Sequence, residues 1–323
     1  TRDEARAFAS DVGSSRVEFG ATAMAELART PAIVVNGVVG IAGFPASVAA
    51  LEEGNRLALA NKESLVAGGS VLTAAAASGG GQLIPVDSEH SAVLQLVDGT
   101  PRDQIHRIVL TASGGPFRGA AREELEDVTP ARALAHPTWK MGDRITIDSA
   151  TLANKGLEVI EAALLFDLDV DDVDVVVHPQ SLVHSMIRLV DGTLLAHIGE
   201  TAMRHPIEYA LTYPDRAVHI DNPFGLAGLS LTFEEPDLDT FRALALAYDA
   251  GRAGGSAPAV FNAADEIAVA AFLQRRLGFL EISTVIERCL EHLPVTKPAT
   301  VEEVMAADRA ARELASSLIA GSC

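Results

Sequence analysis

Short apolar runs alternate with helical patterns over the first third of the chain. The apolar runs end at Gly, Asn or Asp, as buried strands do, and the segments between them have one apolar helical face. After two short helical patterns in 1–30, we expect a strand in 32–40, a helix over 42–54, a strand over 55–61, a helix over 62–78, a strand running into a helix over 82–99, and a strand with a glycine loop over 105–119. This alternation is typical of a parallel α/β sheet, whose ligands bind beyond the carboxyl ends of the strands.

The middle of the chain centres on one strongly patterned stretch, DSATLANKGLEVIEAALLF (148–166). It opens with residues that favour caps and turns, namely Asp148, Ser149, Thr151 and Asn154. An apolar helical face follows, formed by Leu157, Ile160, Ala163 and Leu164. On the predicted helix, Glu158 lies four residues after Asn154 and three after Lys155, so each pair occupies neighbouring positions of one surface.

The rest of the chain predicts a sheet and then a helical bundle. Residues 173–199 hold two or three β-rich runs joined by turn dipeptides such as Asp191-Gly192, which indicates an antiparallel or mixed sheet. A helix is predicted over 203–216, and helical patterns with short breaks fill the chain from about 237. We therefore expect domains at 1–86, 87–216 and 237–323, with a linker at 217–236.

Composition narrows the class of protein. A length of 323 residues, 48% hydrophobic and 21% charged, suggests a soluble globular protein of two or three domains. The formal net charge of −19 argues against a general nucleic-acid binder, and no apolar run reaches the length of a membrane span. The two cysteines, Cys289 and Cys323, form no disulfide framework and indicate a reducing compartment, so we expect a cytoplasmic location.

Acidic residues at two places predict a metal site. Asp87 and Glu89 lie at the end of the strand predicted within 82–99 and are two residues apart, so their side chains can project on the same side. Together with Glu158 they would offer only oxygen ligands, which suit Mg²⁺ or Mn²⁺ and not Zn²⁺. The alternative is an ordinary N-cap at Asp87 and a surface pair of Lys155 and Glu158. The residues alone leave both interpretations open.

Hydroxyl, amide and ammonium groups at one helix start predict an anion site. A start that carries Ser149, Asn154 and Lys155 is suited to bind a phosphate. Ser113, which precedes two glycines, belongs either to a loop that exposes backbone N–H groups to an anion or to a plain tight turn. His136 is either a phosphate or substrate donor or a structural histidine.

Further polar and apolar candidates remain ambiguous at this point. Trp139 and Met141 are either a mobile apolar cover or plain core. His178 and His184 flank a proline turn, and we expect both to be structural.

Seven motifs occur together and in order. They are NKESLV (61–66), PVDSEHSAVLQ (85–95), LTASGGPFRG (110–119), HPTWKMG (136–142), DSATLANKGLEVIEA (148–162), VVVHPQSLVHSMI (175–187) and FNAADEIAVAAF (261–272). This set resembles the 1-deoxy-D-xylulose 5-phosphate reductoisomerase family from about residue 32 onward. The resemblance implies an NADPH- and metal-dependent enzyme that rearranges and reduces 1-deoxy-D-xylulose 5-phosphate to 2-C-methyl-D-erythritol 4-phosphate in non-mevalonate isoprenoid biosynthesis.

The resemblance also implies an architecture and a set of site residues. The α/β fold would combine an incomplete Rossmann-like NADPH domain (1–86), a catalytic domain with a mixed sheet and a lid (87–216), and the C-terminal helical bundle, in a homodimer. Asp87, Glu89 and Glu158 would hold Mg²⁺ or Mn²⁺. The substrate phosphate would be bound by Ser113, Ser149, Asn154 and Lys155, and the rest of the substrate by Lys62, Ser88, His136, Trp139 and Met203, of which His136 and Trp139 belong to the lid. Catalytic roles would fall to Lys62, Glu89, His136 and Glu158, and NADPH contacts to Asn61, Glu63 and Gly142.

The chain departs from the family pattern at three places. It lacks the glycine-rich GxTGSIG turn that seats the NADPH pyrophosphate, and it does not begin with Met, so we expect an N-terminal truncation that removes the first βαβ unit and hides any targeting segment. Thr138 and Lys140 stand where the family usually has Asn and Ser. Thr201 and Ala202 stand where it usually has Pro and Asp, although Met203 is kept.

Three functional hypotheses follow. The first is the reductoisomerase, acting on a small phosphorylated sugar without nucleic acid or membrane. The second is a diverged oxidoreductase on the same scaffold with another phosphorylated substrate. The third is a truncated remnant that binds metal and phosphate, or dimerises, without turnover.

Overall fold

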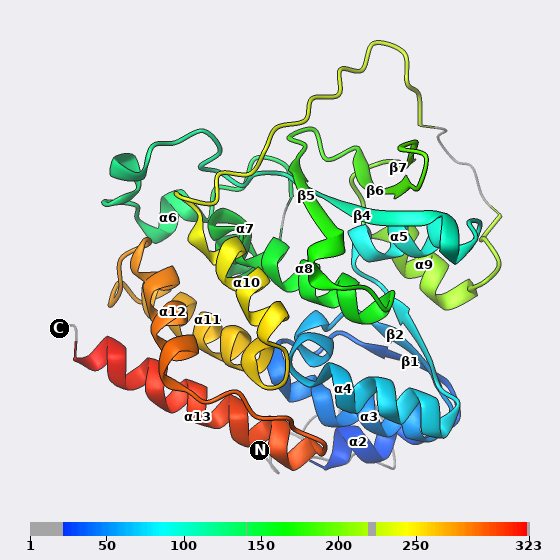
Figure 1. Cartoon of the computed structure of the whole chain (residues 1–323), viewed down its shortest axis with the longest axis horizontal. Coiled ribbons are helices and arrows are strands. Elements are labelled where there is room, and N and C mark those ends of the chain that lie inside the picture. Colours follow the sequence, from blue (N-terminus) through cyan, green and yellow to red (C-terminus); the bar gives the residue numbers. More distant parts are fainter. Residues whose placement is uncertain (1–21, 140, 219–223, 322–323) are drawn as a thin grey trace, which may run out of the picture.

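A three-stranded parallel sheet forms the first layer of the structure, a computed structural model that describes residues 22–139, 141–218 and 224–321 (Figure 1). Its strands, in spatial order, are β1 (Ile33–Asn36), β2 (Arg56–Leu59) and β3 (Gln82–Pro85). The helices around it are α2 (Ala23–Ala28), α3 (Phe44–Glu52), α4 (Lys62–Gly79) and α5 (Ser88–Val97). The predicted alternation of strands and helices is therefore confirmed, and the polar segments after β2 and β3 lie at the carboxyl edge of the sheet.

A second, mixed sheet of four strands confirms the expectation for 173–199. The spatial order is β5-β4-β6-β7, with β4 (Ile105–Ala112), β5 (Val173–Val177), β6 (Val183–Leu189) and β7 (Leu194–Ile198). Strand β5 is parallel to β4, whereas β6 and β7 are antiparallel to their neighbours. Val109, Val183 and Met186 are buried on one face of this sheet, and Ile108, Leu110 and Ile187 join the main core on the other.

The stretch 148–166 forms two helices rather than one, which corrects the sequence expectation. Helix α7 (Asp143–Thr151) ends at Leu152, and α8 (Ala153–Leu165) begins directly after it. Leu152 has a φ of 62°, the left-handed conformation that breaks the helix. Asp148 and Ser149 are thus inside α7 and do not cap the next helix, since no side chain caps α8.

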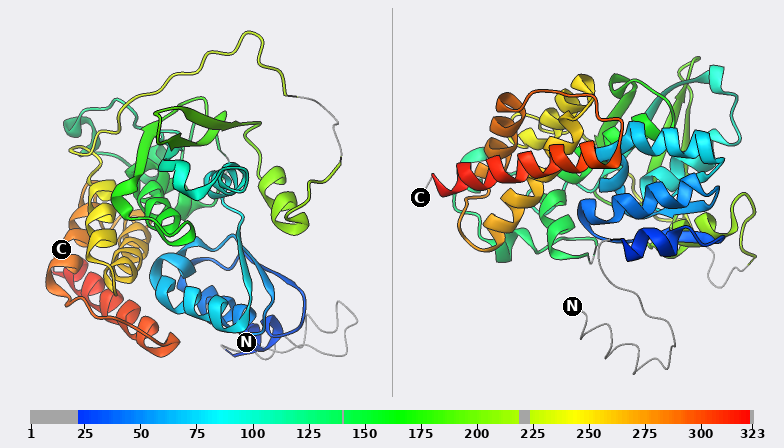
Figure 2. Two further views of the ribbon diagram at one scale, coloured as in Figure 1. Left: turned by 45° about the vertical axis from the view of Figure 1, so that its right-hand side comes forward. Right: turned by 90° about the horizontal axis from the view of Figure 1, so that it is seen from below.

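Four helices form the C-terminal bundle, as predicted. They are α10 (Arg242–Ala253), α11 (Ala257–Leu273), α12 (Glu281–His292) and α13 (Val301–Ala320). Helix α11 is apolar on most sides and is surrounded by α10, α12, α13 and α4. Figures 1 and 2 show the bundle, yellow to red, lying against the blue N-terminal layer and the green helices. A continuous hydrophobic core joins the mixed sheet, α7, α8 and the bundle.

The remaining segments are mostly short or irregular. Helix α6 (Pro130–Ala133) lies between β4 and β5 in sequence, and α9 (Arg204–Thr212) follows β7. The described part of the predicted linker pairs with the sheet only through the bridge between Val177 and Glu234. The helical patterns expected in 1–21, Lys140 and Cys323 lie outside the described residues, whereas Cys289 is buried.

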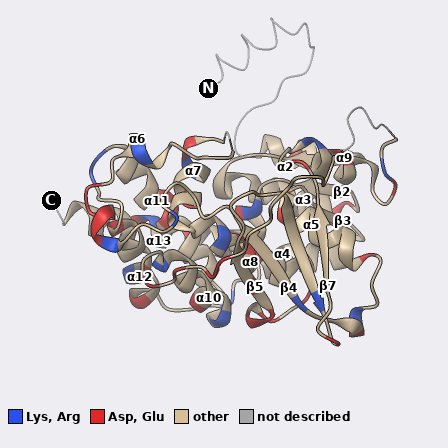
Figure 3. Ribbon diagram, turned by 90° about the horizontal axis from the view of Figure 1, so that it is seen from above, with Lys and Arg blue, Asp and Glu red and all other residues tan. Residues whose placement is uncertain are grey.

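Charged groups are spread over the fold. In the view of Figure 3, Lys and Arg are interspersed with Asp and Glu along the described chain. None of the helices within the described ranges is both long enough and apolar enough to cross a membrane.

Candidate metal and anion site

A cavity of about 280 Å³ opens between the carboxyl edge of the parallel sheet, the mixed sheet and the start of α8. Most of the predicted substrate and metal residues line it, namely Lys62, Asp87, Ser88, Glu89, Ser113, Trp139, Ser149, Asn154, Lys155, Glu158 and Met203. These residues come from six separate segments of the chain. The fold therefore gathers into one cavity what the sequence offered as separate motifs.

Three carboxylates converge at the floor of this cavity. Asp87, Glu89 and Glu158 each offer an oxygen, and the three oxygens lie within 4.8 Å of one another. Asp87 is the N-cap of α5, where its carboxylate accepts from the backbone N–H of Glu89, and Glu89 lies in the first helical turn. Asp87 is thus both the N-cap of α5 and a candidate metal ligand, so the two interpretations do not exclude each other. Asp87 and Glu89 lie just after the end of β3, as expected, and α5 begins between them.

Two buried ammonium groups lie among these carboxylates. Lys62 Nζ contacts Asp87 and is 3.0 Å from Glu158 Oε1. Lys155 Nζ contacts Glu158 and is 3.0 Å from Glu89 Oε1. Burial disfavours both ammonium charges, but the surrounding carboxylates outweigh it and raise the pKa of each lysine.

The donor set of the cluster fits a hard divalent ion. Burial, followed by repulsion from Glu158, raises the pKa of Glu89 to about 7. The Lys62 ammonium, in contrast, helps hold the pKa of Asp87 well below its ordinary value despite burial. A divalent cation would relieve the repulsion between the carboxylates, and oxygen-only coordination suits Mg²⁺ or Mn²⁺.

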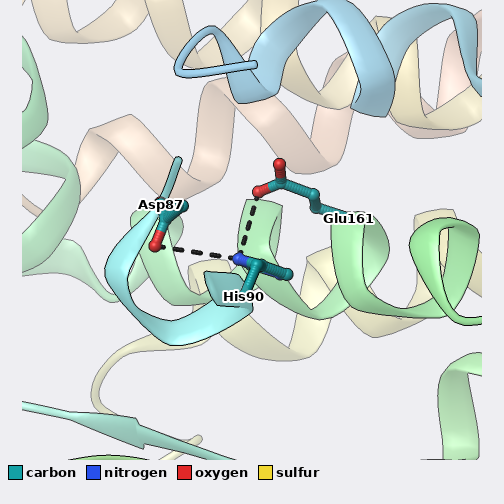
Figure 4. A group of neighbouring side chains, drawn as sticks. All are labelled: Asp87, His90 and Glu161. Atoms are coloured by element: carbon teal, nitrogen blue, oxygen red, sulfur yellow. Dashed lines mark ion pairs between the residues drawn. The ribbon is translucent and has the colours of Figure 1, made fainter. Parts of the chain in front are cut away.

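A buried histidine joins the two segments that carry the carboxylates (Figure 4). His90 Nδ1 lies 3.7 Å from Asp87 Oδ1 and 3.4 Å from Glu161 Oε2. Its Nε2 donates to the backbone carbonyl oxygen of Glu158, 2.9 Å away. Burial opposes the imidazolium, but Glu161 and Asp87 raise the pKa of His90 to about 9.

Sequence reasoning missed His90 and Glu161. A usable signal was present, because each lies three residues after a metal candidate, at 87 and 158, and so on the same face of its helix. Neither carboxylate oxygen of Glu161 accepts a hydrogen bond from another described residue. His90 is therefore the nearest compensating group for this buried acid.

A second polar cluster forms around His136 and includes Ser113 and Ser149, which line the cavity. His136 Nε2 is 3.0 Å from Ser113 Oγ and 3.1 Å from Ser149 Oγ. The backbone N–H groups of Thr138 and Trp139 both donate to His136 Nδ1, which places the ring proton on Nε2. Burial lowers the pKa of His136, so the neutral ring presents an N–H donor between two hydroxyl groups. This arrangement can bind an anionic oxygen.

The helix start at α8 adds an amide to the site. Asn154 accepts from Lys62 Nζ at 2.9 Å and donates to Glu158 Oε1 at 2.5 Å. Ser88 Oγ donates to Glu89 Oε2, also at 2.5 Å. Both side chains therefore connect the acidic cluster to the cavity wall.

Several lining residues were ambiguous or absent in the sequence analysis. Met141 lines the cavity, as do Thr111 and Ser181, which the motifs did not single out. His184 also lines it, although its Nε2 interacts with the carbonyl oxygen of Glu200, 3.1 Å away. His178 is structural as expected, because it is fully buried and its two ring nitrogens contact backbone groups of its own and a neighbouring loop.

The three predicted cofactor residues lie beside the cavity and do not line it. Asn61 caps α4, accepting from Ser64 N, and donates to Glu63 Oε2 at 3.1 Å. Asn61 also donates to the carbonyl oxygen of Gly40 at 2.8 Å, in the loop that follows β1. Gly142 is the N-cap residue of α7. Asn61 and Glu63 thus occupy the edge of the parallel sheet where nucleotides bind in such folds.

Three family models match the chain in succession. Residues 3–69 match 1-deoxy-D-xylulose 5-phosphate reductoisomerase. Residues 83–166 match the 1-deoxy-D-xylulose 5-phosphate reductoisomerase C-terminal domain, and residues 198–314 match the DXP reductoisomerase C-terminal domain.

Curated relatives carry the same name at close to half identity. The 1-deoxy-D-xylulose 5-phosphate reductoisomerase of Chlorobium chlorochromatii is 50% identical over 288 residues, which cover 89% of this chain and 75% of the relative. That of a Geobacillus species is 48% identical over 311 residues, covering 95% of this chain and 82% of the relative.

Solved structures agree in fold. The Zymomonas mobilis 1-deoxy-D-xylulose 5-phosphate reductoisomerase in complex with NADPH has a TM-score of 0.86 at 43% identity, covering 93% of this chain and 78% of that one. A DOX-P reductoisomerase in complex with NADPH, fosmidomycin and magnesium has a TM-score of 0.91 at 36% identity, covering 97% and 83%.

Proposed function

This chain belongs to the 1-deoxy-D-xylulose 5-phosphate reductoisomerase family, and from that premise we propose that it is an NADPH-dependent enzyme converting 1-deoxy-D-xylulose 5-phosphate to 2-C-methyl-D-erythritol 4-phosphate. The observation that carries the proposal is the convergence of Asp87, Glu89 and Glu158 in the cavity that Ser113 and Ser149 also line.

The acidic cluster would hold the divalent ion. Asp87, Glu89 and Glu158 supply oxygen ligands. A cation would be favoured there because it would offset the repulsion between Glu158 and Glu89, which helps raise the pKa of Glu89. A bound Mg²⁺ or Mn²⁺ would stabilise negative charge developing on the substrate oxygens. Lys62, beside the same carboxylates, would orient the substrate and hold a proton near the reacting carbons.

Hydroxyl, imidazole, amide and ammonium groups in and beside the cavity would bind the phosphate. Ser113 Oγ and Ser149 Oγ flank the N–H at His136 Nε2, which would donate to a phosphate oxygen. Asn154 and Lys155 at the start of α8 complete the proposed set. Because the phosphate is remote from the reacting carbons, its binding energy would go into orienting the substrate.

Apolar and polar residues around the cavity would complete the substrate site. Trp139 and Met203 line it and would cover the substrate from two sides, with Ser88 beside the acidic cluster. Trp139 belongs to the lid segment 136–142, which would exclude water from the reacting atoms.

The cofactor site would lie along the carboxyl edge of the parallel sheet. Asn61, Glu63 and Gly142 are the proposed contacts, and NADPH bound there would supply the hydride for the reduction. The proposed division of the chain follows the same plan, with a cofactor domain at 1–86, a catalytic domain at 87–216, a linker at 217–236 and the bundle at 237–323.

We also propose a homodimer. Strand β7 is at an edge of the mixed sheet, and its Leu194, Leu195 and Ile198 are each more than a third exposed. An exposed apolar edge strand favours pairing with another surface. Sedimentation equilibrium tests this: a monomer across the micromolar range contradicts it.

One assay tests the central proposal. NADPH oxidation is measured with 1-deoxy-D-xylulose 5-phosphate and Mn²⁺, on this chain and on the chain extended at its N-terminus by the glycine-rich turn of a relative. Metal-dependent turnover in either chain supports the function. Turnover in neither, although both fold and bind Mn²⁺, overturns it and favours the diverged oxidoreductase; turnover restricted to the extended chain identifies the shorter one as an inactive binder.

A further inference from the structure

One guanidinium joins three segments that are far apart in sequence. Arg144 is the second residue of α7, directly after the lid segment 136–142. Its Nη1 lies 2.8 Å from Glu63 Oε1 in the first turn of α4, and its Nη2 lies 3.0 Å from Asn262 Oδ1 of α11. Nη1 also donates to Glu266 Oε1 at 3.1 Å. Arg144 thus connects the proposed cofactor edge, the base of the lid and the bundle.

These contacts are shielded from solvent. The side chain of Arg144 is 18% exposed, that of Glu63 is 14% exposed, and Asp265, whose Oδ2 lies 3.5 Å from Nη2, is fully buried. Asp148 Oδ2 lies 3.4 Å from Arg144 Nε on the same helix. A planar guanidinium with five donors can satisfy acceptors in several directions at once, which an ammonium cannot do with the same geometry.

The contact with Glu63 continues into the loop after β1. Glu63 uses one carboxylate oxygen for Arg144 and the other for Asn61, and Asn61 donates to the carbonyl oxygen of Gly40. Glu266 also approaches this loop, since a Cβ on Gly40 would lie 2.9 Å from Glu266 Oε1. Both carboxylates that Arg144 Nη1 binds therefore abut the segment where the cofactor is proposed to lie.

We propose that Arg144 is a positioning residue that holds the Asn61–Glu63 segment against the base of the lid, and thereby sets the affinity of the cofactor site. The cofactor part of this inference rests on the proposed function. Arg144 itself does not line the substrate cavity. Its effect passes through Glu63 and Asn61, so removing it should affect the cofactor without affecting the metal.

The same network supplies a matched control. Arg312 of α13 donates to Glu266 Oε2 at 2.5 Å and to Asp308 Oδ2 at 2.7 Å. It is half-buried and shares Glu266 with Arg144, but within the described chain it forms no hydrogen bond or ion pair with Glu63 or α7. Arg312→Met therefore removes a guanidinium from the network while leaving the Arg144–Glu63 pair intact.

The first experiment measures amide hydrogen exchange on the chain without ligands. In Arg144→Met, peptides covering 61–66 and 142–146 should exchange about tenfold faster than in the wild type, whereas Arg312→Met should change only α11 and α13. Arg144→Lys, which keeps the charge, serves if the Met variant does not fold, and it should show the same regional pattern. Unchanged exchange at 61–66 in the folded Arg144 variants overturns the inference.

The second experiment measures NADPH binding through the fluorescence of Trp139, the single tryptophan of the chain. Arg144→Met should raise the NADPH dissociation constant about tenfold and leave that of Mn²⁺ within twofold, and Glu63→Gln should do the same. The double variant should bind NADPH no more weakly than either single variant, because both changes break one connection. Additive losses, or an equal loss in Arg312→Met, overturn the inference.

The two experiments separate this inference from the proposed function. A wild-type chain that binds no NADPH, including the form extended by the glycine-rich turn, contradicts the proposed cofactor. Hydrogen exchange then still decides whether Arg144 positions the Asn61–Glu63 segment. Conversely, normal NADPH binding in Arg144→Met leaves the function standing and removes the positioning role.

Discussion

The Nε2 atom of His90 lies 2.9 Å from the backbone carbonyl oxygen of Glu158. Because Nδ1 of the same ring faces Asp87 and Glu161, one imidazole fixes the spacing between α5 and α8. These segments carry all three proposed metal ligands, since Asp87 caps α5, Glu89 lies in its first turn and Glu158 lies in α8. The metal site thus depends on a residue that is not itself among the ligands.

We predict that His90→Ala weakens Mn²⁺ binding about tenfold or more, because groups that orient metal ligands typically contribute at that level. The affinity is measured by titration of Mn²⁺ monitored by electron paramagnetic resonance. His106→Ala is the control, because His106 is exposed and does not belong to the acidic cluster. Wild-type affinity in a folded His90→Ala protein would reject the orienting role.

We predict that Glu158→Gln abolishes metal-dependent turnover. The substitution keeps the size of a side chain that is 1% exposed. It removes the negative charge that contacts Lys62 and Lys155 and that would bind the ion. Turnover is measured over a range of Mg²⁺ and Mn²⁺ concentrations in a chain that is active before substitution. Glu126→Gln, at an exposed position, should leave the rate unchanged. Near-normal turnover with Mg²⁺ in Glu158→Gln contradicts the assignment of Glu158 as a ligand.

We predict that Lys155→Ala raises the Michaelis constant for the phosphorylated substrate far more than that for NADPH. The Lys155 ammonium is at the start of α8 in the substrate cavity, whereas the proposed NADPH contacts do not line that cavity. Steady-state kinetics with each substrate varied in turn measure both constants. Equal increases would argue that Lys155 acts on the fold of the whole site and not on the phosphate.

We predict that the carboxyl group of Asp265 makes stability fall as the pH rises from about 4 to 6. Burial, together with repulsion from Glu266, raises the pKa of Asp265 to about 6 even though Arg144 opposes this. The folded state therefore binds more protons in this window than the unfolded chain, whose aspartates titrate near 3.9, so stability is lost as the pH rises.

Urea denaturation at several pH values measures this loss. In Asp265→Asn the free energy of unfolding should decline less between pH 4 and 6 than in the wild type, because the amide does not titrate. Exposed Asp239 supplies the comparison, and Asp239→Asn should run parallel to the wild type. A curve for Asp265→Asn that is also parallel to the wild type would refute the prediction.

The order of elements could be predicted from the sequence because the hydrophobic period is a local signal. The runs at 32–40 and 55–61 gave β1 and β2, and the helical patterns after 237 gave the four bundle helices. Glycine and proline marked the boundaries between them. The mixed sheet was also visible, because β-rich runs were joined by turn dipeptides.

The break at Leu152 could not be predicted from the pattern. Leucine is a good helix former and rarely adopts a positive φ, so nothing local indicated a left-handed residue there. Its side chain is 4% exposed and packs in the main core, which indicates that tertiary packing stabilises the strained backbone. The long-range contacts of Leu152 thus outweigh its local preference for the right-handed helical conformation.

The convergence of the acidic residues was predicted only in outline. Asp87 and Glu158 are 71 positions apart. The motifs predicted that they share a metal site, but not the distances or orientations of their side chains. Arg144 was missed because most of its partners come from other segments of the chain, whereas His90 could have been found from its position three residues after Asp87. Hydrogen bonds between distant segments leave no periodic trace in a sequence.

Lys62 and Lys155 give the acidic cluster its own counter-ions. A protein supplied in this way keeps its charges balanced when no divalent cation is bound, so a chelator should strip the site without unfolding the chain. A divalent cation bound by these carboxylates would compete with the two ammonium groups, which would then be available to a ligand in the cavity. Cation binding and the attraction of an anionic sugar phosphate would then be coupled, because the ammonium groups displaced by the cation would face the anion.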